Sequence, residues 1–492
     1  MKGFYRYTLN RIFFRLLMMA IWMTPSCTYN EEWDSYYRDA PDQVEDNVVK
    51  LMEQDENFSR FHEALIQYGF EDLLSRNQYF TLFVPVNAAF EGLSEYSDEQ
   101  WKDIIGFHIL YTSIFSHDFA DRDLMTTIGK YLKMRKQGDN GYRIFESVIN
   151  PSNMDNFCRN GVIHEIDRLM IPQPNLYEYI MSLDTTYSIL QDFLNSMDER
   201  YIDYDRSERI GVDDNGNAIY DTIWREENYF LDQIAGLDNE SEAYTGFLPA
   251  NNDVRNALES VSGYFGNISD LDEKTYSQLL FITFSGSFVE HAYTYDLLPD
   301  TVISVTGKTV AKAQLNLGQG NVEVSNGMVH LLDGMTIPRN YFLLPIVIEC
   351  DRKEGRTVSN TVYPIEVLGD TRASNGSYIG YGCQFVGDYL EFRVDMVLKS
   401  TYWIVWTGPK QGPSHYQISV WDEGTAEFVN VGPPVNNWTK GWFNIVEAGS
   451  YTFDQFGTKR VRITIVDEEP LPGFNSIYVD YIKLIPEEIY DQ

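Results

Sequence analysis

The chain has 492 residues, which is too long for one hydrophobic core and suits about three domains. Hydrophobic residues make up 43% of it and charged residues 23%, a composition that is typical of folded proteins. The formal net charge of −35 repels phosphate and no stripe of Lys and Arg offsets it, so the sequence excludes a nucleic-acid-binding function.

Residues 1–26 have the pattern of a secretion signal. A basic segment is followed by a short apolar run, LLMMAIWM, which cannot span a hydrocarbon layer ~30 Å thick. Cys27 then follows the small residue Ser26, which resembles the lipobox of bacterial lipoproteins, whose Cys becomes the lipidated N-terminus. Thr24 and Pro25 depart from that pattern, and an ordinary secretion signal is the alternative.

Residues 27–41 are polar and aromatic without helical or strand periodicity, which predicts a tether. Glu31 and Glu32 resemble the acidic export signal that directs some Gram-negative lipoproteins to the outside of the outer membrane. Together with the lipobox, this pair predicts a protein that is lipid-anchored in the outer membrane and exposed on the cell surface. The membrane is therefore an expected partner, through the anchor.

Two motifs with the same spacing predict a repeat. NGVIHEIDRLMIP occupies Asn160–Pro172, and NGMVHLLDGMTIP occupies Asn326–Pro338. Each follows a helical segment and then a strand that ends in Pro and Asn, FTLFVPVN in the first copy and YTGFLPANN in the second. The same order at nearly one period predicts two tandem α+β domains, residues 42–174 and 175–340.

These motifs resemble the TxFxPxNxAF and NGxxHxID boxes of fasciclin-like domains. The resemblance implies a twisted β-core flanked by helices, a non-catalytic protein and a role in cell adhesion. Members of that family carry a Tyr-His pair in a central box, and here the pair is Phe107-His108 in the first copy and Ile282-Thr283 in the second.

Histidines are the first candidates for a catalytic or metal-binding role. His108 lies in an apolar run, which favours a hydrogen-bonded core histidine. His164 and His330 recur at matched positions of two different domains, so a structural role such as holding a turn is favoured. No P-loop, GxSxG, HExxH or CxxC motif occurs. We therefore expect no catalytic residue, no metal ion and no cofactor.

Residues 203–233 are an insertion in the second copy. Asp213, Asn215 and Asn217 alternate oxygen ligands, but the Gly and Glu positions of an EF-hand loop do not fit. Asn215-Gly216 between apolar residues favours a tight β-hairpin instead.

Residues 343–492 alternate apolar and polar residues between Gly, Pro and Asn turns, which predicts an all-β sandwich or jelly roll. The phrases GDYLEFRVDM and VDYIKL resemble strands of carbohydrate-binding modules of the galactose-binding-like type. The resemblance implies a sugar ligand. In that family an Asn just before the closing DYI often binds sugar, and here Tyr478 holds that place with Asn475 nearby. The expected fold class is thus multidomain, with two α+β fasciclin-like domains followed by this sandwich.

Five of the nine tryptophans fall within this last domain. Trp438, in the loop sequence PPVNNWTKG, is our first candidate for stacking on a sugar, with Trp421, Tyr478 and Asn475 as companions.

The other three tryptophans lie in predicted strands. Trp442 opens the predicted strand WFNIV and should be buried. Trp403 and Trp406 differ in strand parity, so at most one of them points inward.

Three cysteines follow Cys27 in the sequence. Cys350 and Cys383 could close a loop within the last domain, but three free and mostly buried thiols, including Cys158, are favoured.

The sequence therefore predicts a non-catalytic lipoprotein that acts in adhesion or glycan capture. Its expected partners are a polysaccharide and an outer-membrane nutrient-uptake complex, to which it would be accessory. The alternative is a structural subunit that docks on a partner protein complex without binding glycan itself. A contiguous apolar surface patch would favour this alternative.

Overall fold

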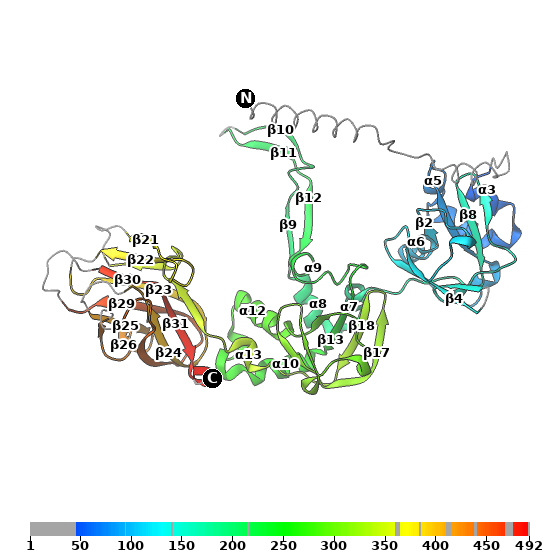
Figure 1. The fold of residues 1–492 in the computed structure, drawn as a ribbon. Coiled ribbons are helices and arrows are strands. Elements are labelled where there is room, and N and C mark those ends of the chain that lie inside the picture. The colour runs from blue at the N-terminus through cyan, green and yellow to red at the C-terminus, as the bar shows by residue number, and fades with distance from the viewer. Residues whose placement is uncertain are drawn as a thin grey trace, which may run out of the picture. The chain divides into compact units, whose positions relative to one another are not determined.

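The computed structural model describes residues 46–93, 95–138, 141–213, 216–359, 365–382, 385–409, 415–436, 440–467 and 476–490 (Figure 1). They belong to two compact units, which divide between Pro172 and Gln173. The predicted signal, tether and lipidation site at Cys27 lie outside the described residues, as do Cys383, Trp438 and Asn475. No helix in the described ranges is long and apolar enough to cross a membrane.

The first unit is built on a four-stranded sheet. Its strands, in spatial order, are β2 (Ile109–Leu110), β1 (Phe80–Pro85), β8 (Gly161–Ile166) and β7 (Asn156–Cys158). The central pair, β1 and β8, is parallel, and the outer pairs are antiparallel. A second, antiparallel sheet consists of β3 (Arg122–Met125), β4 (Tyr131–Gln137), β5 (Gly141–Ile144) and β6 (Ser147–Val148).

The helices of the first unit bury an apolar face. They are α3 (Val48–Glu53), η1 (Glu56–Phe58), α4 (Ser59–Gln67), α5 (Glu71–Leu74), η2 (Asn87–Phe90), α6 (Asp98–Phe107) and η3 (Ser116–Asp118). In α4, Phe61 and Leu65 are fully buried on one face, against the buried residues of β1. Ser97 and Gln100 form a capping box at the start of α6.

The second unit begins with a domain that repeats this central sheet. Its order is β14 (Phe288–Glu290), β13 (Tyr244–Pro249), β18 (Gly327–Leu332) and β17 (Leu317–Val324), again with the middle pair parallel. A two-stranded sheet, β15 (Thr301–Ile303) with β16 (Thr309–Ala311), accompanies it. The helices are α7 (Leu176–Ser182), η4 (Thr185–Tyr187), α8 (Ser188–Asn195), α9 (Tyr229–Gln233), α10 (Asn251–Ser260), α11 (Ser262–Phe265), η5 (Ile268–Asp270), α12 (Glu273–Phe284), η6 (Tyr295–Leu297), η7 (Lys312–Gln314) and α13 (Arg339–Phe342).

The repeated Asn-Gly motif has the same structural task in both domains. Asn160 Oδ1 accepts a hydrogen bond from the backbone N of Val48 at 2.9 Å, at the start of α3. Asn326 Oδ1 accepts one from the backbone N of Leu176 at 2.8 Å, at the start of α7. Each Asn also donates to a backbone carbonyl, as Asn160 Nδ2 does to Leu74 at 2.6 Å. The motif therefore ties the first helix of each domain to its central sheet.

The glycines of the motif permit close approach of two backbones. A Cβ on Gly161 would collide with the carbonyl oxygen of Phe80, and one on Gly327 with that of Tyr244. Phe80 faces Gly161 in the register of the sheet, as Tyr244 faces Gly327. The parallel pairing at the centre of each domain thus depends on glycine at this point.

The insertion of the second domain forms a two-stranded ribbon, which Figure 1 shows projecting from this domain beside α8 and α9. Strands β9 (Asp198–Ile202) and β12 (Trp224–Asn228) pair antiparallel, and beyond them β10 (Glu208–Val212) pairs with β11 (Ala218–Asp221). The predicted hairpin is confirmed, and pairing begins at Asp198, five residues before the predicted start at 203. We call residues 198–228 the arm.

The described residues of the C-terminal domain form strands and one short helix, α14 (Glu487–Tyr490). One sheet has the order β19 (Ile346–Glu349), β31 (Tyr481–Pro486), β24 (Ser400–Thr407) and β28 (Val446–Phe453). A second has β20 (Arg356–Val358), β23 (Tyr389–Val397), β29 (Gly457–Ile465), β25 (His415–Asp422) and β26 (Glu427–Asn430), with β27 (Val435–Asn436) also paired to β25. A three-stranded sheet has β21 (Ile365–Gly369), β22 (Ser377–Gly382) and β30 (Ser476–Val479).

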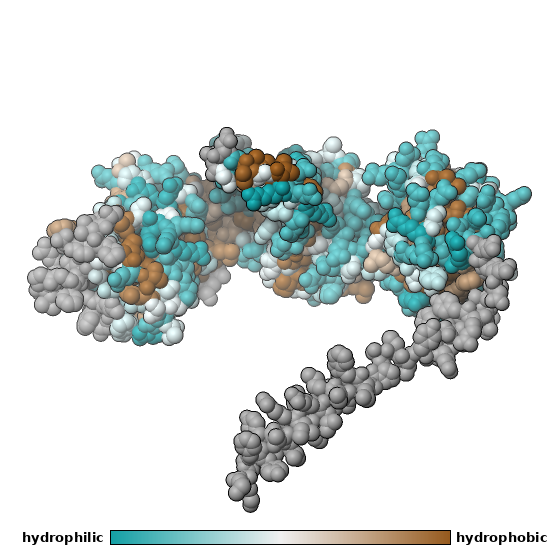
Figure 2. Space-filling view, turned by 90° about the horizontal axis from the view of Figure 1, so that it is seen from above, coloured by the Kyte–Doolittle hydropathy of each residue, from teal (hydrophilic) through white to brown (hydrophobic). Residues whose placement is uncertain are grey.

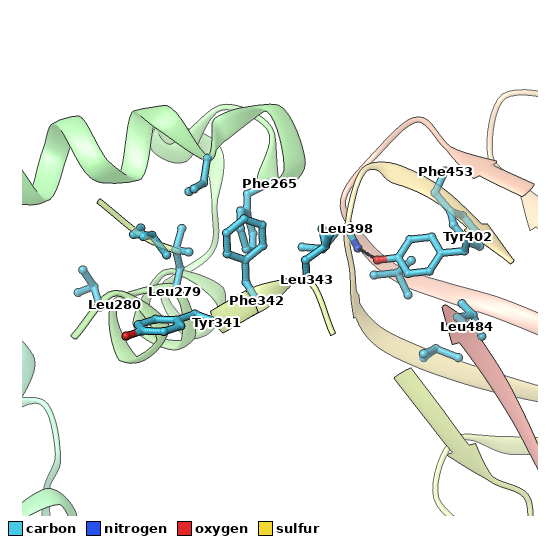
Figure 3. Packing of buried hydrophobic residues seen from close by; sticks show 14 of the residues in the cluster. Phe265, Leu279, Leu280, Tyr341, Phe342, Leu343, Leu398, Tyr402, Phe453 and Leu484 are labelled. Atoms are coloured by element: carbon cyan, nitrogen blue, oxygen red, sulfur yellow. Dashed lines mark hydrogen bonds between the residues drawn. The ribbon is translucent and has the colours of Figure 1, made fainter. Parts of the chain in front are cut away.

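Within the second unit, one hydrophobic cluster continues from the fasciclin-like domain into the sandwich (Figure 3). Phe265 and Phe342 lie together, with ring centroids 5.6 Å apart. Leu343 continues this row toward Leu398, whose backbone N donates to the hydroxyl of Tyr402 at 3.1 Å (Figure 3). The sandwich therefore packs on the C-terminal end of the second fasciclin-like domain.

Candidate functional site

The described tryptophans of the sandwich divide into core and surface residues. Trp406 is fully buried, whereas Trp403 is half-buried and stacks on Tyr490 with ring centroids 4.9 Å apart. The predicted difference in orientation along β24 is therefore confirmed.

The prediction that Trp442 fills the core is wrong, because its side chain is 42% exposed. The segment WFN is a turn and not the start of a strand. Gly441 and Phe443 both have positive φ, 96° and 53°, which a strand cannot accommodate. Asn444 Nδ2 donates to the Lys440 carbonyl at 2.6 Å and closes the turn, which places Trp442 at the surface.

Arg372 lies against the exposed tryptophan. Its guanidinium carbon is 4.6 Å from the ring centroid of Trp442 and 5.4 Å from that of Phe443. Its Nε and Nη2 donate to the two carboxylate oxygens of Asp370 at 2.9 and 2.6 Å, which fixes the plane of the guanidinium. This ion pair lowers the pKa of Asp370 to about 2, chiefly through the hydrogen bond from Arg372. The carboxylate therefore stays ionised and keeps Arg372 in place.

Tyr478 is connected to this pair through the rings of Tyr378 and Phe443. Its ring is 6.5 Å from that of Tyr378, and Tyr378 is 5.6 Å from Phe443 in an edge-to-face contact. Tyr478 also covers Gly380, where a Cβ would come within 2.8 Å of its ring. We call Arg372, Tyr378, Trp442, Phe443 and Tyr478 the aromatic–arginine cluster.

Trp421, the other predicted companion that the structure describes, is not part of this cluster. Tyr416, near the start of β25, donates its hydroxyl to the carbonyl of Ser476, where β30 begins, while Trp421 lies five residues further along β25. At 3.3–3.4 Å per residue this separation is ~17 Å. Trp421 instead packs on Phe428, at 5.2 Å between centroids, and on Arg460, at 4.5 Å. The structure therefore separates Trp421 from Tyr478.

Trp438 and Asn475 stay predictions, since both lie outside the described residues. Along the chain they stand close to the cluster, because Trp438 precedes Trp442 by four residues and Asn475 precedes Tyr478 by three.

Sequence reasoning missed Arg372 and the exposure of Trp442. Gly441 directly before Trp442 is a signal that could have revealed the turn, because glycine interrupts a strand. The spacing of Asp370 and Arg372 offers a weaker signal for an oriented guanidinium.

The histidines have the structural roles that the sequence predicts. His108 is fully buried, its Nδ1 donates to the carbonyl of Ile104 at 2.7 Å and its Nε2 accepts from the backbone N of Met170 at 3.0 Å. Burial lowers the pKa of His108 to about 4. His164 Nε2 and His330 Nε2 each lie 2.8 Å from a loop carbonyl and stack on a strand phenylalanine.

Metal-binding and thiol chemistry find little support in the described part of the chain. No group of three or more His, Cys, Asp or Glu side chains there could hold a metal ion. Cys158 and Cys350 are free and buried, and burial raises the pKa of both thiols, which makes them poor nucleophiles.

Comparison with known proteins identifies part of this architecture. The fasciclin domain family matches residues 56–172. Transforming growth factor-beta-induced protein ig-h3 from Sus scrofa is 26% identical over 241 residues, which are 46% of this chain and 32% of that protein. Human periostin is 26% identical over 146 residues, 28% of this chain and 17% of that protein. The chain thus spans less than a third of these curated relatives.

Two solved structures are similar to different parts of the chain. The FAS1 domain pair of the insect cell adhesion molecule fasciclin I covers 58% of this chain and 98% of its own, at 13% identity and a TM-score of 0.23. A family 35 carbohydrate-binding module from Clostridium thermocellum covers 29% of this chain and 98% of its own, at 21% identity and a TM-score of 0.21.

Residues 56–172 are therefore a fasciclin domain. The identical strand order and pairing of the second domain show the same fold there. The chain is a multidomain protein with two α+β fasciclin-like domains followed by an all-β sandwich, as the sequence predicts.

Proposed function

We propose that this protein is a non-catalytic lipoprotein of the cell surface whose C-terminal sandwich binds a glycan and whose fasciclin-like pair acts in adhesion. The observation that carries the proposal is the aromatic–arginine cluster, in which an exposed tryptophan ring lies beside an oriented guanidinium.

The chemistry of the cluster suits a sugar. The apolar face of a pyranose ring stacks on a flat aromatic side chain, and Trp442 offers an exposed ring of this kind. A guanidinium carries five N–H donors, and Asp370 accepts from only two of its nitrogens. The remaining donors, which take no acceptor among the described residues, suit hydroxyl or carboxylate oxygens of a sugar. Stacking and directed hydrogen bonds are together what a glycan site requires.

Trp438 and Asn475 remain predicted members of this site. Trp438 is predicted from its loop sequence and Asn475 from the resemblance to carbohydrate-binding modules, and both stand within four residues of a member of the cluster along the chain. Trp421 is left out of it because Trp421 lies near the end of β25, whereas β30, which carries Tyr478, begins near the start of β25.

The place of the protein on the cell rests on its first residues. The apolar run before Cys27, and Glu31-Glu32 after it, support a lipid anchor and exposure outside the outer membrane. There the protein would hand captured polysaccharide to an outer-membrane uptake system. Cys27→Ala should release the protein into the soluble periplasmic fraction, and unchanged partition with the outer membrane would rule the anchor out.

Glycan binding is tested on the full chain with a panel of immobilised neutral and uronic-acid polysaccharides. Trp442→Ala and Arg372→Ala should each weaken binding by about tenfold, since an aromatic or Arg side chain that a ligand buries carries much of the binding energy. Trp224→Ala is the matched control, because Trp224 is 48% exposed but belongs to the arm. Binding that survives Trp442→Ala, or no binding to any polysaccharide, would favour the alternative of a docking subunit that binds no glycan.

A further inference from the structure

Several apolar side chains of the arm are exposed to solvent and are not buried by the arm itself. Ile210, Val212 and Ile219 are 65%, 55% and 43% exposed near its tip, and Figure 2, which looks down on the arm, shows hydrophobic atoms gathered there. Ile219 pairs with Gly211 and Val212 pairs with Ala218, so apolar side chains are exposed on both faces of the ribbon. A two-stranded ribbon is marginally stable in water when nothing covers it, and exposed apolar residues gathered in one place mark interaction surfaces.

The stem of the arm differs from its tip. In the stem, the guanidinium of Arg200 lies 4.8 Å from the ring centroid of Trp224, and that of Arg225 lies 5.9 Å from Tyr201. These cation–π contacts join the two strands of the stem and leave Trp224 48% and Tyr201 36% exposed. The exposed residues of the tip are aliphatic and make no cation–π contact, so an external partner would bury them.

The arm is not needed to complete the fasciclin-like fold. The first domain passes from α5 to β1 without an insertion and forms the same central sheet. The base of the arm is closed by a hydrogen bond from the backbone N of Tyr229 to the carbonyl of Met197 at 2.9 Å. The arm is therefore an addition to a domain whose fold is complete without it.

Charge indicates the chemistry of the partner. Within the arm, Asp and Glu outnumber Arg by ten to four. Three of the arginines pair with acids of the arm itself: Arg200 with Glu226 at 3.7 Å, Arg206 with Asp203 at 3.6 Å, and Arg225 with Glu227. The excess of carboxylates around an apolar tip favours a basic partner, and it disfavours a second copy of this acidic chain because the two arms would repel each other.

The two edges of the tip are not equivalent. The pairing of β10 shifts between Arg209 and Gly211, and a β-bulge at this place discourages the addition of another strand. Strand β11 has no irregularity and presents the backbone of Ala218–Asp221 along its outer edge. Strand addition to an open edge is a common mode of peptide recognition.

We propose that the tip of the arm is a docking site for a basic partner protein, which adds to the edge of β11 a strand with alternating Lys or Arg and apolar residues. The site is separate from the aromatic–arginine cluster, and it does not depend on glycan binding.

The first test uses a defined probe, a ten-residue peptide that alternates Lys and Val, and measures its binding to the full chain by fluorescence anisotropy. The variant Ile210→Ser/Val212→Ser/Ile219→Ser keeps every charge. Its affinity for the peptide should be lower than that of the wild type by a factor of about ten or more. Ile303→Ser is the control, since Ile303 is 59% exposed in β15 of the same domain, and it should leave binding unchanged. Equal binding by the triple variant, or equal binding of a peptide that alternates Glu and Val, would overturn the proposal. No binding of the Lys peptide to the wild type would overturn it as well.

A photo-crosslinker at position 219 of the full chain in native cells tests the docking partner itself, with a crosslinker at position 303 as the control. The expected product joins position 219, and not position 303, to a segment with Lys or Arg beside apolar residues. A product with a second copy of the chain, or the same products from both positions, would contradict the proposal. Both triple variant and wild type should bind polysaccharide equally, so failure of the docking site is distinguishable from failure of the glycan site.

Discussion

The two fasciclin-like domains agree where their sequences repeat and differ where they do not. Both have the same order of strands in the central sheet, and both use Asn and Gly of the motif to join the first helix and the neighbouring strand. A threonine also recurs, since Thr81 and Thr245 each accept a hydrogen bond from, and donate one to, the loop after the next strand of the sheet. The residues that recur in the two copies thus mostly form hydrogen bonds with backbone groups.

The differences lie at the edges of the shared sheet. The first domain adds a four-stranded sheet, the second a two-stranded sheet and the arm. At the end of the helix that connects two strands of the central sheet, α6 in the first domain and α12 in the second, His108 and Thr283 each donate to the carbonyl four residues earlier. The comparison teaches that the motif maintains the fold, while insertions and single buried positions are free to give each domain its own properties.

The largest expected effect comes from the motif glycines. Gly161→Ala or Gly327→Ala should lower the free energy of unfolding of its own domain by about 4 kcal/mol or more, since the added Cβ meets a backbone oxygen that only a shift of the sheet can relieve. Hydrogen exchange of the amides in β1 and β13, measured on the full chain, reports each domain separately.

Gly263→Ala is the control for this pair, because a Cβ there meets no atom within 4 Å. Native protection of β1 in Gly161→Ala would show that the two parallel strands tolerate a side chain at their closest approach.

The next effect concerns the motif asparagines. Asn160→Ala leaves the backbone N of Val48 and the carbonyl of Leu74 without a partner in a buried place, and Asn326→Ala does the same in the second domain. An unsatisfied buried group costs about 1–3 kcal/mol, so each variant should lose about 3 kcal/mol. If the repeat is structural, the two losses should agree within about 1 kcal/mol.

Asn87→Ala separates burial from hydrogen bonding. Asn87 also holds a helix, through bonds with the backbone of Arg60 and Glu56 at 2.9 and 2.8 Å, but this site is open to water. Water can replace the lost bonds, and the loss should stay near 1 kcal/mol. If Asn87→Ala lowers the free energy of unfolding as much as Asn160→Ala does, burial does not explain the cost of removing Asn160.

Much of the fold could be predicted from the sequence, because its signals are local or repeated. The stripe of Phe61 and Leu65, the capping box at Ser97, and the hairpin at Gly216 each follow from neighbouring residues. The register of the parallel strands could not be predicted. It depends on contacts between Phe80 and Gly161, which are far apart in the sequence.

The candidate site was harder to predict for the same reason. The prediction that Trp442 is buried was wrong because WFNIV has the composition of a strand. The positive φ of Gly441 and Phe443 makes a turn there, which directs Trp442 outward. Trp421 and Tyr478 looked like companions by residue type, yet Trp421 lies near the end of β25 and the strand of Tyr478, β30, begins near the start of β25. Arg372 was overlooked because its proximity to Trp442 arises from folding and not from spacing.

A smaller effect should distinguish the two domains by pH. The pKa of His108 is lowered to about 4 in the folded domain by burial, whereas the unfolded value is about 6.5. The unfolded state therefore binds the proton more tightly, and stability is lost as the pH falls from about 6.5 toward 4. At pH 5 the first domain should be about 2 kcal/mol less stable than at pH 7, and burial of His164, which also lowers its pKa, acts in the same direction.

Hydrogen exchange at pH 7 and pH 5, corrected for the intrinsic exchange rates, compares β1 with β13 in one sample. Thr283 does not titrate, so the second domain lacks this contribution. His108→Asn keeps a donor for the Ile104 carbonyl and removes the titrating group, so it should flatten the pH dependence of the first domain. An equal loss in both domains, unaffected by His108→Asn, would assign acid sensitivity to groups other than this histidine.

The smallest expected effect is that of removing the arm. Asn228 caps α9 and donates to the carbonyl of Leu194, and it pairs with Asp198 across the base, so these residues must stay. Replacing residues 200–226 by Asn-Gly leaves this base closed by a tight turn. Because the arm has little contact with the domain beyond its base, the opening free energy of β13 should change by no more than about 0.5 kcal/mol, as is usual for surface changes. Hydrogen exchange of β13 in the shortened and full-length chains measures this difference, and the first domain is the internal reference. A loss of 2 kcal/mol or more would mean that the second domain needs the arm to fold, and that the two domains are less alike than their shared sheet indicates.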